Sequence, residues 1–235
     1  MSSWIEFWNR DPSIYANERH KLLHYRGVAS DIVRLIDRDG VRVLDHGSGE
    51  ASSAGLVAAR AGELVLCDAA PNTREKISQK FADHANIRVI GPERLGDHPD
   101  GYFDLIIANS VLQYLDEPTL EASLVEWRRL LKPDGRLILA DVIPPDVSPV
   151  TDALALLRFA FQGGFLGAAL LGLVRTTLSD YRTLRGELGF STHSADELIS
   201  RLDRHGFDAR RLAHNIGHNS ARMTFEARHK ADRVV

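Results

Sequence analysis

Short, largely apolar runs recur through the middle of the chain, and each ends at a polar residue. They occupy residues 41–44, 64–67, 103–108 and 137–140. Runs of this length, rich in valine, isoleucine and leucine, predict strands of a parallel sheet that is buried on both faces. The intervals between them carry apolar residues at helical spacing, as between 28 and 36 and between 119 and 131. This alternation of strands and helices predicts an α/β domain.

The rest of the chain adds shorter elements. Further strands are predicted at 86–90, 207–212 and 221–227, and a charged helix or loop at 179–188. Ser194, followed by Glu197 three residues later, has the capping-box pattern of a helix start, and Gly206 marks the end of that helix. Three prolines between 141 and 149 predict an irregular loop.

The segment 152–174 is very apolar and approaches the length of a membrane span. Arg158 and Gln162 interrupt it, however, and the glycine pair at 163–164 would weaken a single helix at its centre. We therefore predict two short helices joined at the glycines. A substrate-side wall, a dimer interface and plain burial all stay open as roles for this segment.

Two glycines one residue apart follow the first predicted strand. Gly47 and Gly49 lie just after Asp45, and a helix is predicted over 52–60. Glycines let the backbone turn sharply and approach a ligand, while a helix start points free N–H groups toward it. Asp68 ends the next strand, 19 residues beyond Gly49, where a ribose-binding carboxylate belongs. A nucleotide-like ligand is expected here, although a plain turn would use the same glycines.

Four motifs in this order resemble the class I S-adenosylmethionine-dependent methyltransferases. They are Asp-x-Gly-x-Gly-x-Ala at 45–51, the acid Asp68, Asp-Leu-Ile-Ile-x-Asn at 104–109 and Leu-Lys-Pro-Asp-Gly-Arg-Leu at 131–137. The resemblance covers about Val41 to Val142. It implies a Rossmann-like, seven-stranded, mostly parallel sheet with an antiparallel C-terminal strand and a helical insertion after the fifth strand.

The resemblance also implies one methyltransferase domain over 1–235. We expect its parts to be an N-terminal helical lid region at 1–39, a cofactor-binding core at 40–149, a helical substrate-side insertion at 150–190, and a C-terminal helix and hairpin at 191–235.

The cofactor implied by the resemblance is S-adenosyl-L-methionine. In this family Asp45 would lie near its methionine end, Asp68 would bind the ribose hydroxyls, and the backbone at Ala69 would flank the adenine. Gly47 and Gly49 would allow the close backbone approach. Asn109 and Ser110 would lie beside the donated methyl group.

One position departs from the family pattern. After the third strand the family commonly places an acid that holds the adenine amino group, but Pro92 stands there in this chain. The contact could come from Glu93, from the backbone, or from no side chain at all.

Catalytic candidates come from two loops at the expected reaction centre. Tyr114 follows the fourth strand, where packing under the next helix is its alternative role. The loop 213–220 contributes His214 and His218 as candidate general bases, because histidine has an unperturbed pKa near neutral pH. Asn215 in the same loop is a candidate substrate contact. A polar surface hairpin stays open for this loop, and no metal site is predicted.

Substrate candidates come from the two helical additions. The N-terminal segment of this family often folds over the cofactor, which suggests Tyr15 and His20 as contacts, with His24 and Tyr25 also in that segment. Simple anchoring of an aromatic leader is the alternative. In the segment after the fifth strand, Phe161 and Phe165 would supply an apolar wall to the acceptor pocket.

Composition restricts the partners. The 235 residues carry a formal net charge of −3, and 26% are charged, so no strong field gathers nucleic acid. The sequence Asn-Ser-Val-Leu at 109–112 also lacks the Asn-Pro-Pro-aromatic signature of methyltransferases that act on nucleic-acid bases. One cysteine, Cys67, and an N-terminus without an apolar export segment favour a cytoplasmic protein.

We therefore predict an enzyme that transfers a methyl group from S-adenosylmethionine to a small, largely apolar molecule at oxygen or nitrogen. Peripheral contact with a membrane or lipid substrate, and a homodimer, stay open. An NAD(P)-binding oxidoreductase is the alternative enzyme, disfavoured because Ser52 stands where the third glycine of the dinucleotide fingerprint belongs. A non-catalytic methyltransferase-like binding protein is the other alternative.

Overall fold

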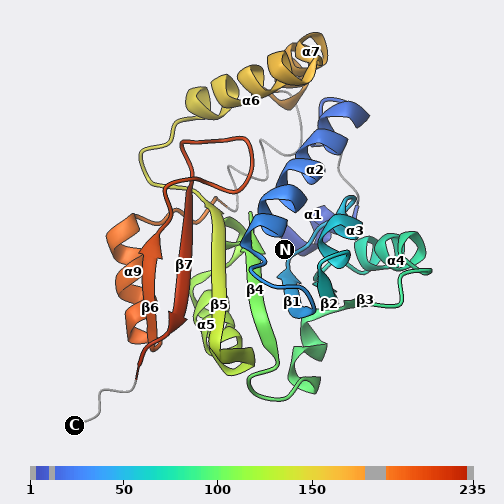
Figure 1. Cartoon of the computed structure of the whole chain (residues 1–235). Coiled ribbons are helices and arrows are strands. Elements are labelled where there is room, and N and C mark those ends of the chain that lie inside the picture. The colour runs from blue at the N-terminus through green and yellow to red at the C-terminus, as the bar shows by residue number, and fades with distance from the viewer. Residues whose placement is uncertain (1–3, 11–13, 178–188, 232–235) are drawn as a thin grey trace.

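A twisted seven-stranded sheet runs through the molecule in the order β3-β2-β1-β4-β5-β7-β6 (Figure 1). The computed structural model describes residues 4–10, 14–177 and 189–231, so the segment predicted at 179–188 lies outside it. The strands are β1 (Val41–His46), β2 (Ala61–Cys67), β3 (Ile87–Ile90), β4 (Phe103–Asn109), β5 (Leu131–Val142), β6 (Phe207–Arg211) and β7 (Met223–His229). Only β7 is antiparallel to its neighbours, which confirms the predicted mostly parallel sheet.

Helices cover both faces of this sheet, as the apolar strand patterns require. The α-helices are α1 (Trp4–Asn9), α2 (Glu18–Leu35), α3 (Ala54–Ala58), α4 (Pro71–Lys80), α5 (Glu117–Leu130), α6 (Pro149–Gly163), α7 (Leu166–Thr177) and α9 (Ala195–Arg204). Short 3₁₀ turns occupy Pro92–Asp97 and Leu112–Tyr114. The helices α2, α3 and α4 pack on one face and α5 and α9 on the other, which gives three layers.

Each face has its own hydrophobic cluster. On one side the fully buried Trp127 and Leu124 of α5 pack with Leu44 and Ile106 of the sheet. On the other side Ile32 of α2 belongs to a cluster with residues of α3, α4 and the opposite strand faces. Because β1 and β4 lie at the centre of both clusters, their carboxyl ends are held firmly, and the polar residues that follow them are fixed in place.

The apolar segment after β5 folds as predicted into two helices joined at the glycines. The helix α6 ends at Gly163, and Gly164 takes the left-handed conformation with a φ of +72° that closes the helix. The helix α7 then folds back beside α6, at the top of Figure 1. Across the residues that the structure describes, no helix is long and apolar enough to cross a membrane.

One local prediction was wrong. The helix expected over 52–60 is only five residues long, Ala54–Ala58, and residues 47–53 form a turn instead. Ser52 and Ser53 belong to a turn that the Ala54 N–H closes on the Ala51 carbonyl at 2.8 Å, and the helix ends before its C-cap residue Ala59.

Candidate active site

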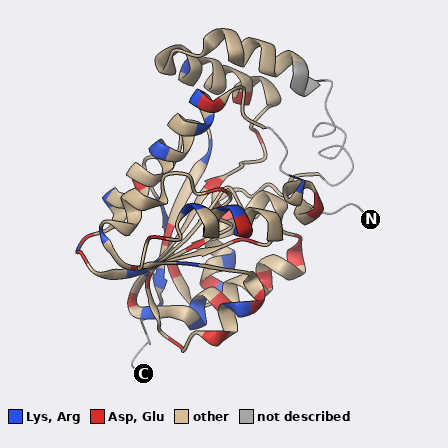
Figure 2. Cartoon of the chain, turned by 90° about the vertical axis from the view of Figure 1, so that its right-hand side faces the viewer, with Lys and Arg blue, Asp and Glu red and all other residues tan. Residues whose placement is uncertain are grey.

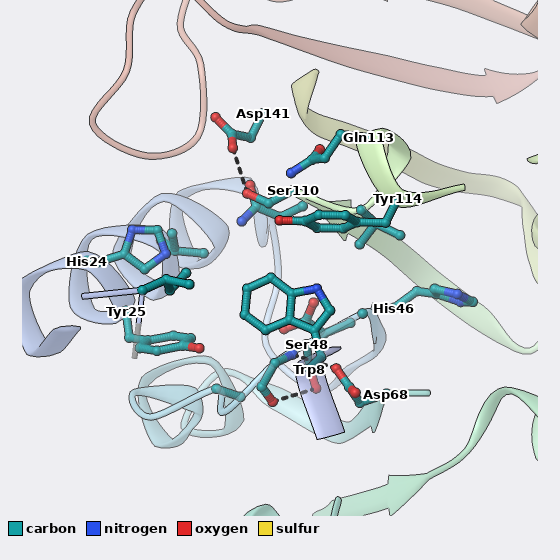
Figure 3. Close-up of a pocket in the computed structure, with 18 of the residues that line it drawn as sticks. Trp8, His24, Tyr25, His46, Ser48, Asp68, Ser110, Gln113, Tyr114 and Asp141 are labelled. Atoms are coloured by element: carbon teal, nitrogen blue, oxygen red, sulfur yellow. Dashed lines mark hydrogen bonds between the residues drawn. The ribbon is translucent and has the colours of Figure 1, made fainter. Parts of the chain in front are cut away.

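A cavity of about 1400 Å³ lies at the carboxyl ends of β1, β2 and β4 (Figure 3). Residues of α1 and α2 cover it, and Leu156 of α6 and Gly172 of α7 also line it. Parallel α/β sheets commonly bind ligands at this edge. The volume exceeds the ~300–1,000 Å³ of a typical small-ligand pocket, so there is room for two ligands side by side.

The cavity brings together most of the predicted site residues. They are Tyr15, His20, Asp45, Gly47, Gly49, Asp68, Ala69, Asn109, Ser110, Tyr114 and His218. Five predicted residues do not line it, namely Glu93, Phe161, Phe165, His214 and Asn215.

The glycine turn is held from two sides by the rest of the protein. Gly47 and Gly49 have φ values of +74° and +55°, which only glycine adopts readily. The N–H of Gly49 donates to Asp68 Oδ2 at 2.9 Å, and the N–H of Glu50 donates to Tyr25 Oη at 3.1 Å. The turn is therefore tied to β2 below and to α2 above it.

Asp68 organises the end of β2. Its two carboxylate oxygens accept the N–H groups of Gly49 and Ala70, each at 2.9 Å. Burial raises the pKa of Asp68, while these two N–H donors and Arg74 oppose the rise. Each oxygen keeps a second lone pair, so the carboxylate can still accept hydroxyl groups of a ligand while it holds the turn.

Asp45 faces the cavity from the end of β1, and its carboxylate accepts no hydrogen bond from any residue that the structure describes. Burial, and then repulsion by Asp68, raises the pKa of Asp45 to about 7. A cationic group of a ligand would relieve both effects, because it supplies the missing opposite charge.

This raised pKa predicts a pH-dependent affinity for a cationic cofactor. Below pH 7 Asp45 is protonated and must lose its proton before it attracts an ammonium group, so affinity falls by up to about tenfold per pH unit. Above pH 7 the group is already ionised and the affinity levels off. His20 and His24 do not interfere, since burial lowers their pKa values to about 4 and about 3.

Titration of S-adenosylmethionine by calorimetry between pH 6 and pH 8 checks this expectation. In the Asp45→Asn variant, which cannot ionise, the profile should be flat. A wild-type affinity that does not change over this range would exclude the proposed role of Asp45.

Two residues at the carboxyl ends of β4 and β5 have a strained backbone. Ser110 after β4 and Asp141 in β5 have φ values of +58° and +57°, which are uncommon for residues other than glycine. Ser110 Oγ donates to Asp141 Oδ2 at 2.7 Å, and Arg222 Nη1 donates to the same oxygen at 3.0 Å. Strain of this kind concentrates at functional sites, and here it aims polar groups at the cavity.

Asn215 supports this network from outside the cavity, so its predicted role as a substrate contact is corrected. Its Oδ1 accepts the N–H of Asp141 at 3.1 Å and the hydroxyl of Thr224 at 2.8 Å, and its amide donates to the Asn219 carbonyl. With its side chain used in this way, Asn215 fixes the 213–220 loop to β5.

That loop carries His218 into the cavity, as predicted, where it meets two histidines of α2. His218 stacks on Phe159 at 4.5 Å between ring centroids, and the centroid of His24 lies 6.1 Å from that of His218. Burial lowers the pKa of His218, an effect that Asp141 opposes. The three imidazoles are therefore neutral at pH 7, and each keeps an unprotonated nitrogen.

His20 and Tyr15 complete this side of the cavity. His20 Nδ1 accepts the N–H of Ala16 at 3.1 Å, so its proton is on Nε2. Tyr15 packs edge-on against His20 and lies beside Tyr25, and burial raises its pKa. The N-terminal segment thus contacts the cavity, and a substrate-binding role for Tyr15 and His20 stays a prediction.

A cluster of aromatic residues, which the sequence did not reveal as site residues, closes the opposite side. Trp4 and Trp8 of α1 lie 4.8 and 5.6 Å from the ring of Tyr114, and Phe190 lies 5.6 Å from it. Figure 3 shows Trp8 and Tyr114 side by side in the cavity. The aromatic residues gathered near the N-terminus were the available sequence signal. Their placement in the cavity, however, depends on α1 folding back over α4.

His46 is a second residue that sequence reasoning missed. The indole N–H of Trp127 donates to His46 Nδ1 at 3.2 Å, which fixes the ring and anchors the turn to α5. Burial lowers the pKa of His46 to about 4, so the ring stays neutral. Its place inside the Asp-x-Gly motif could have marked it, although no spacing rule assigns it a role.

Three further predicted positions lie away from the cavity. Phe161 is 75% exposed on the outer side of α6, because the face of this helix that packs inward carries Ala160 instead. Phe165 is buried, but it stacks on the outside of His20 at 4.9 Å. His214 is exposed at the start of the 213–220 loop.

Glu93 also lies outside the cavity and is exposed at the start of the 3₁₀ turn that follows β3. Pro92 opens this turn, and the Glu93 carboxylate folds back over Gly91. Two buried oxygens inside the cavity are better placed for a ligand. Asn109 Oδ1 and Gln113 Oε1 have no hydrogen-bond partner in the part of the chain that the structure describes.

Comparison with known proteins shows similarity to methyltransferases. A family model described as a methyltransferase domain matches residues 44–139. Nocamycin O-methyltransferase of Saccharothrix syringae is 34% identical over 209 residues, which are 74% of this chain and 72% of that protein. Malonyl-[acyl-carrier protein] O-methyltransferase of Laribacter hongkongensis is 33% identical over 141 residues, which are 55% of this chain and 44% of that protein.

The fold is also found among solved structures. A SAM-dependent methyltransferase from Aquifex aeolicus has a TM-score of 0.54 to this chain at 17% identity. The similarity covers 85% of this chain and 87% of the Aquifex chain. At this identity it concerns the fold alone.

Proposed function

The chain belongs to the class I S-adenosylmethionine-dependent methyltransferases, and from this we propose that it methylates a small, largely apolar molecule at oxygen or nitrogen. One observation carries the proposal. The cavity brings together the glycine turn with its two carboxylates, neutral histidines on the α2 side, and the aromatic rings of α1 and Tyr114 on the opposite side.

The cofactor end fits S-adenosylmethionine. Asp45 offers an ammonium group a carboxylate that has no hydrogen-bond partner among the described residues, and Asp68 offers free lone pairs for ribose hydroxyls. Asn109 Oδ1 is a buried acceptor that lacks a donor within the described structure. These groups are polar, preformed and on the sheet edge, which is the arrangement that a nucleoside ligand needs.

The histidine and aromatic sides of the cavity fit an acceptor of low polarity. S-adenosylmethionine supplies a methyl group on a positively charged sulfur, so transfer chiefly requires that an acceptor atom is placed in line and that water is excluded. Trp4, Trp8 and Tyr114 provide an apolar surface, and the cavity side chains of α2 cover the turn. His218 can take the proton that an acceptor hydroxyl or ammonium loses, because its ring is neutral at pH 7.

Methyl transfer can be measured with S-adenosylmethionine labelled in its methyl group. We expect label to enter apolar phenols, aliphatic acids or amines from a panel, with one S-adenosylhomocysteine released for each methyl group transferred. Hydrophilic acceptors of the same size, such as sugars, are the matched control and should remain unlabelled. Label in sugars or in added protein, with none in the apolar acceptors, would contradict the proposal.

A further inference from the structure

The outer side of the α6–α7 hairpin is apolar to a degree that a soluble surface does not require. On α6 the exposed residues Val150, Leu154 and Phe161 lie on one face, at spacings of four and seven. On α7 the exposed residues are Leu166, Leu170, Leu171 and Val174, also along one face. Exposed apolar side chains gathered in this way mark an interaction surface.

The charges around these residues are positive on balance. Within residues 14–28 and 144–174, three arginines are exposed, Arg19, Arg26 and Arg158, against two exposed carboxylates, Glu18 and Asp146. The single acid of the hairpin, Asp152, is turned inward, where it accepts from Asn219 at 2.7 Å and pairs with Arg222 at 3.1 Å. Figure 2 shows the hairpin almost free of charged residues apart from these.

From this arrangement we propose that the hairpin docks on the surface of an anionic phospholipid bilayer. Leucine, valine and phenylalanine side chains would enter the boundary between headgroups and acyl chains, and the arginines would meet lipid phosphates. A second copy of the chain fits less well. In a two-fold interface the same patch meets itself, which would bring Arg158 toward its own copy.

The inner side of the hairpin connects this surface with the active site. Leu156 and Gly172 line the cavity from α6 and α7, while Ala160, Phe165 and Ala169 form a small buried cluster that holds the two helices together. An acceptor dissolved in the lipid would therefore reach the cavity beside the docked hairpin. This part of the inference, though not the docking itself, rests on the proposed methyl transfer.

Sedimentation with lipid vesicles tests the docking without any need for turnover. The full chain should sediment with vesicles of phosphatidylcholine mixed with phosphatidylglycerol, and less with pure phosphatidylcholine or at high salt. Phe161→Asp and Leu170→Asp should each lower partitioning by at least about tenfold, since each removes a large apolar side chain from the lipid.

Val125→Asp is the matched control, because Val125 is 60% exposed on α5 and lies outside the hairpin. It should partition as the wild type does. All three variants should keep the wild-type melting temperature, because the three side chains are exposed. They should also keep the S-adenosylmethionine affinity, since none of these residues lines the cavity.

Three outcomes would overturn the docking proposal. They are a wild type that does not sediment with anionic vesicles, hairpin variants that sediment as the wild type does, and a wild-type dimer that Leu170→Asp dissociates without lipid. Vesicle binding without methyl transfer would instead contradict the proposed function and leave the docking standing.

Discussion

Replacing Gly47 with valine is expected to lower the affinity for S-adenosylmethionine by more than about a hundredfold. A Cβ at this position would lie 2.3 Å from Val111 Cγ2, so either the turn or the start of the 3₁₀ element after β4 must move. The φ of +74° adds roughly 1–2 kcal/mol of strain, and the overlap adds about 1–3 kcal/mol. The clash is thus with Val111 of the protein itself.

Gly40 offers a matched control for this substitution. It has a similar φ of +80°, a Cβ added there would meet no atom within 4 Å, and it does not line the cavity. Gly40→Val should therefore lose some stability but keep its cofactor affinity. Calorimetric titration of both variants separates the two effects, and equal affinities in Gly47→Val and Gly40→Val would refute the account of the turn.

Replacing His218 with glutamine is expected to lower kcat by about a hundredfold, which is the lower end of the contribution of a general base. The KM for S-adenosylmethionine should change little, because His218 faces the acceptor end of the cavity. Since burial lowers the pKa of His218, the wild-type kcat at saturating S-adenosylmethionine should persist below pH 6.5 and fall only when the pH passes this lowered pKa.

His214→Gln is the control for this experiment, because His214 lies in the same loop but outside the cavity. It should keep the wild-type kcat. Steady-state kinetics over a range of pH provide the measurement. If His218→Gln retains kcat within about threefold, the acceptor loses its proton without this residue.

The sheet and the cofactor end of the site could be predicted from sequence because both depend on local patterns. The apolar runs define buried strands, and polar residues directly after them, such as Asp45, Asp68 and Asn109, necessarily meet at the carboxyl edge. The glycine joint of the α6–α7 hairpin was predictable for the same reason, since the pair Gly163 and Gly164 lies at the centre of the apolar segment 152–174.

The acceptor end was predicted less well because tertiary packing decides it. Trp8 enters the cavity only because α1 folds back on α4, where the backbone N–H of Asn72 donates to Asn9 Oδ1 at 2.9 Å. Phe161 and Ala160 are neighbours, and the rotation of α6 alone decides which one faces inward. The left-handed angles at Ser110 and Asp141 have no sequence signal, because neither residue is glycine.

The central claim is that this cavity binds S-adenosylmethionine rather than a dinucleotide. Calorimetric titration of the wild type with S-adenosylhomocysteine and with NAD, at pH 8, tests it most directly. The predicted result is saturable binding of S-adenosylhomocysteine and no measurable binding of NAD. In the Asp68→Ala variant the binding free energy of S-adenosylhomocysteine should weaken by about 1.5–3 kcal/mol. Binding of NAD with no heat from S-adenosylhomocysteine would contradict it.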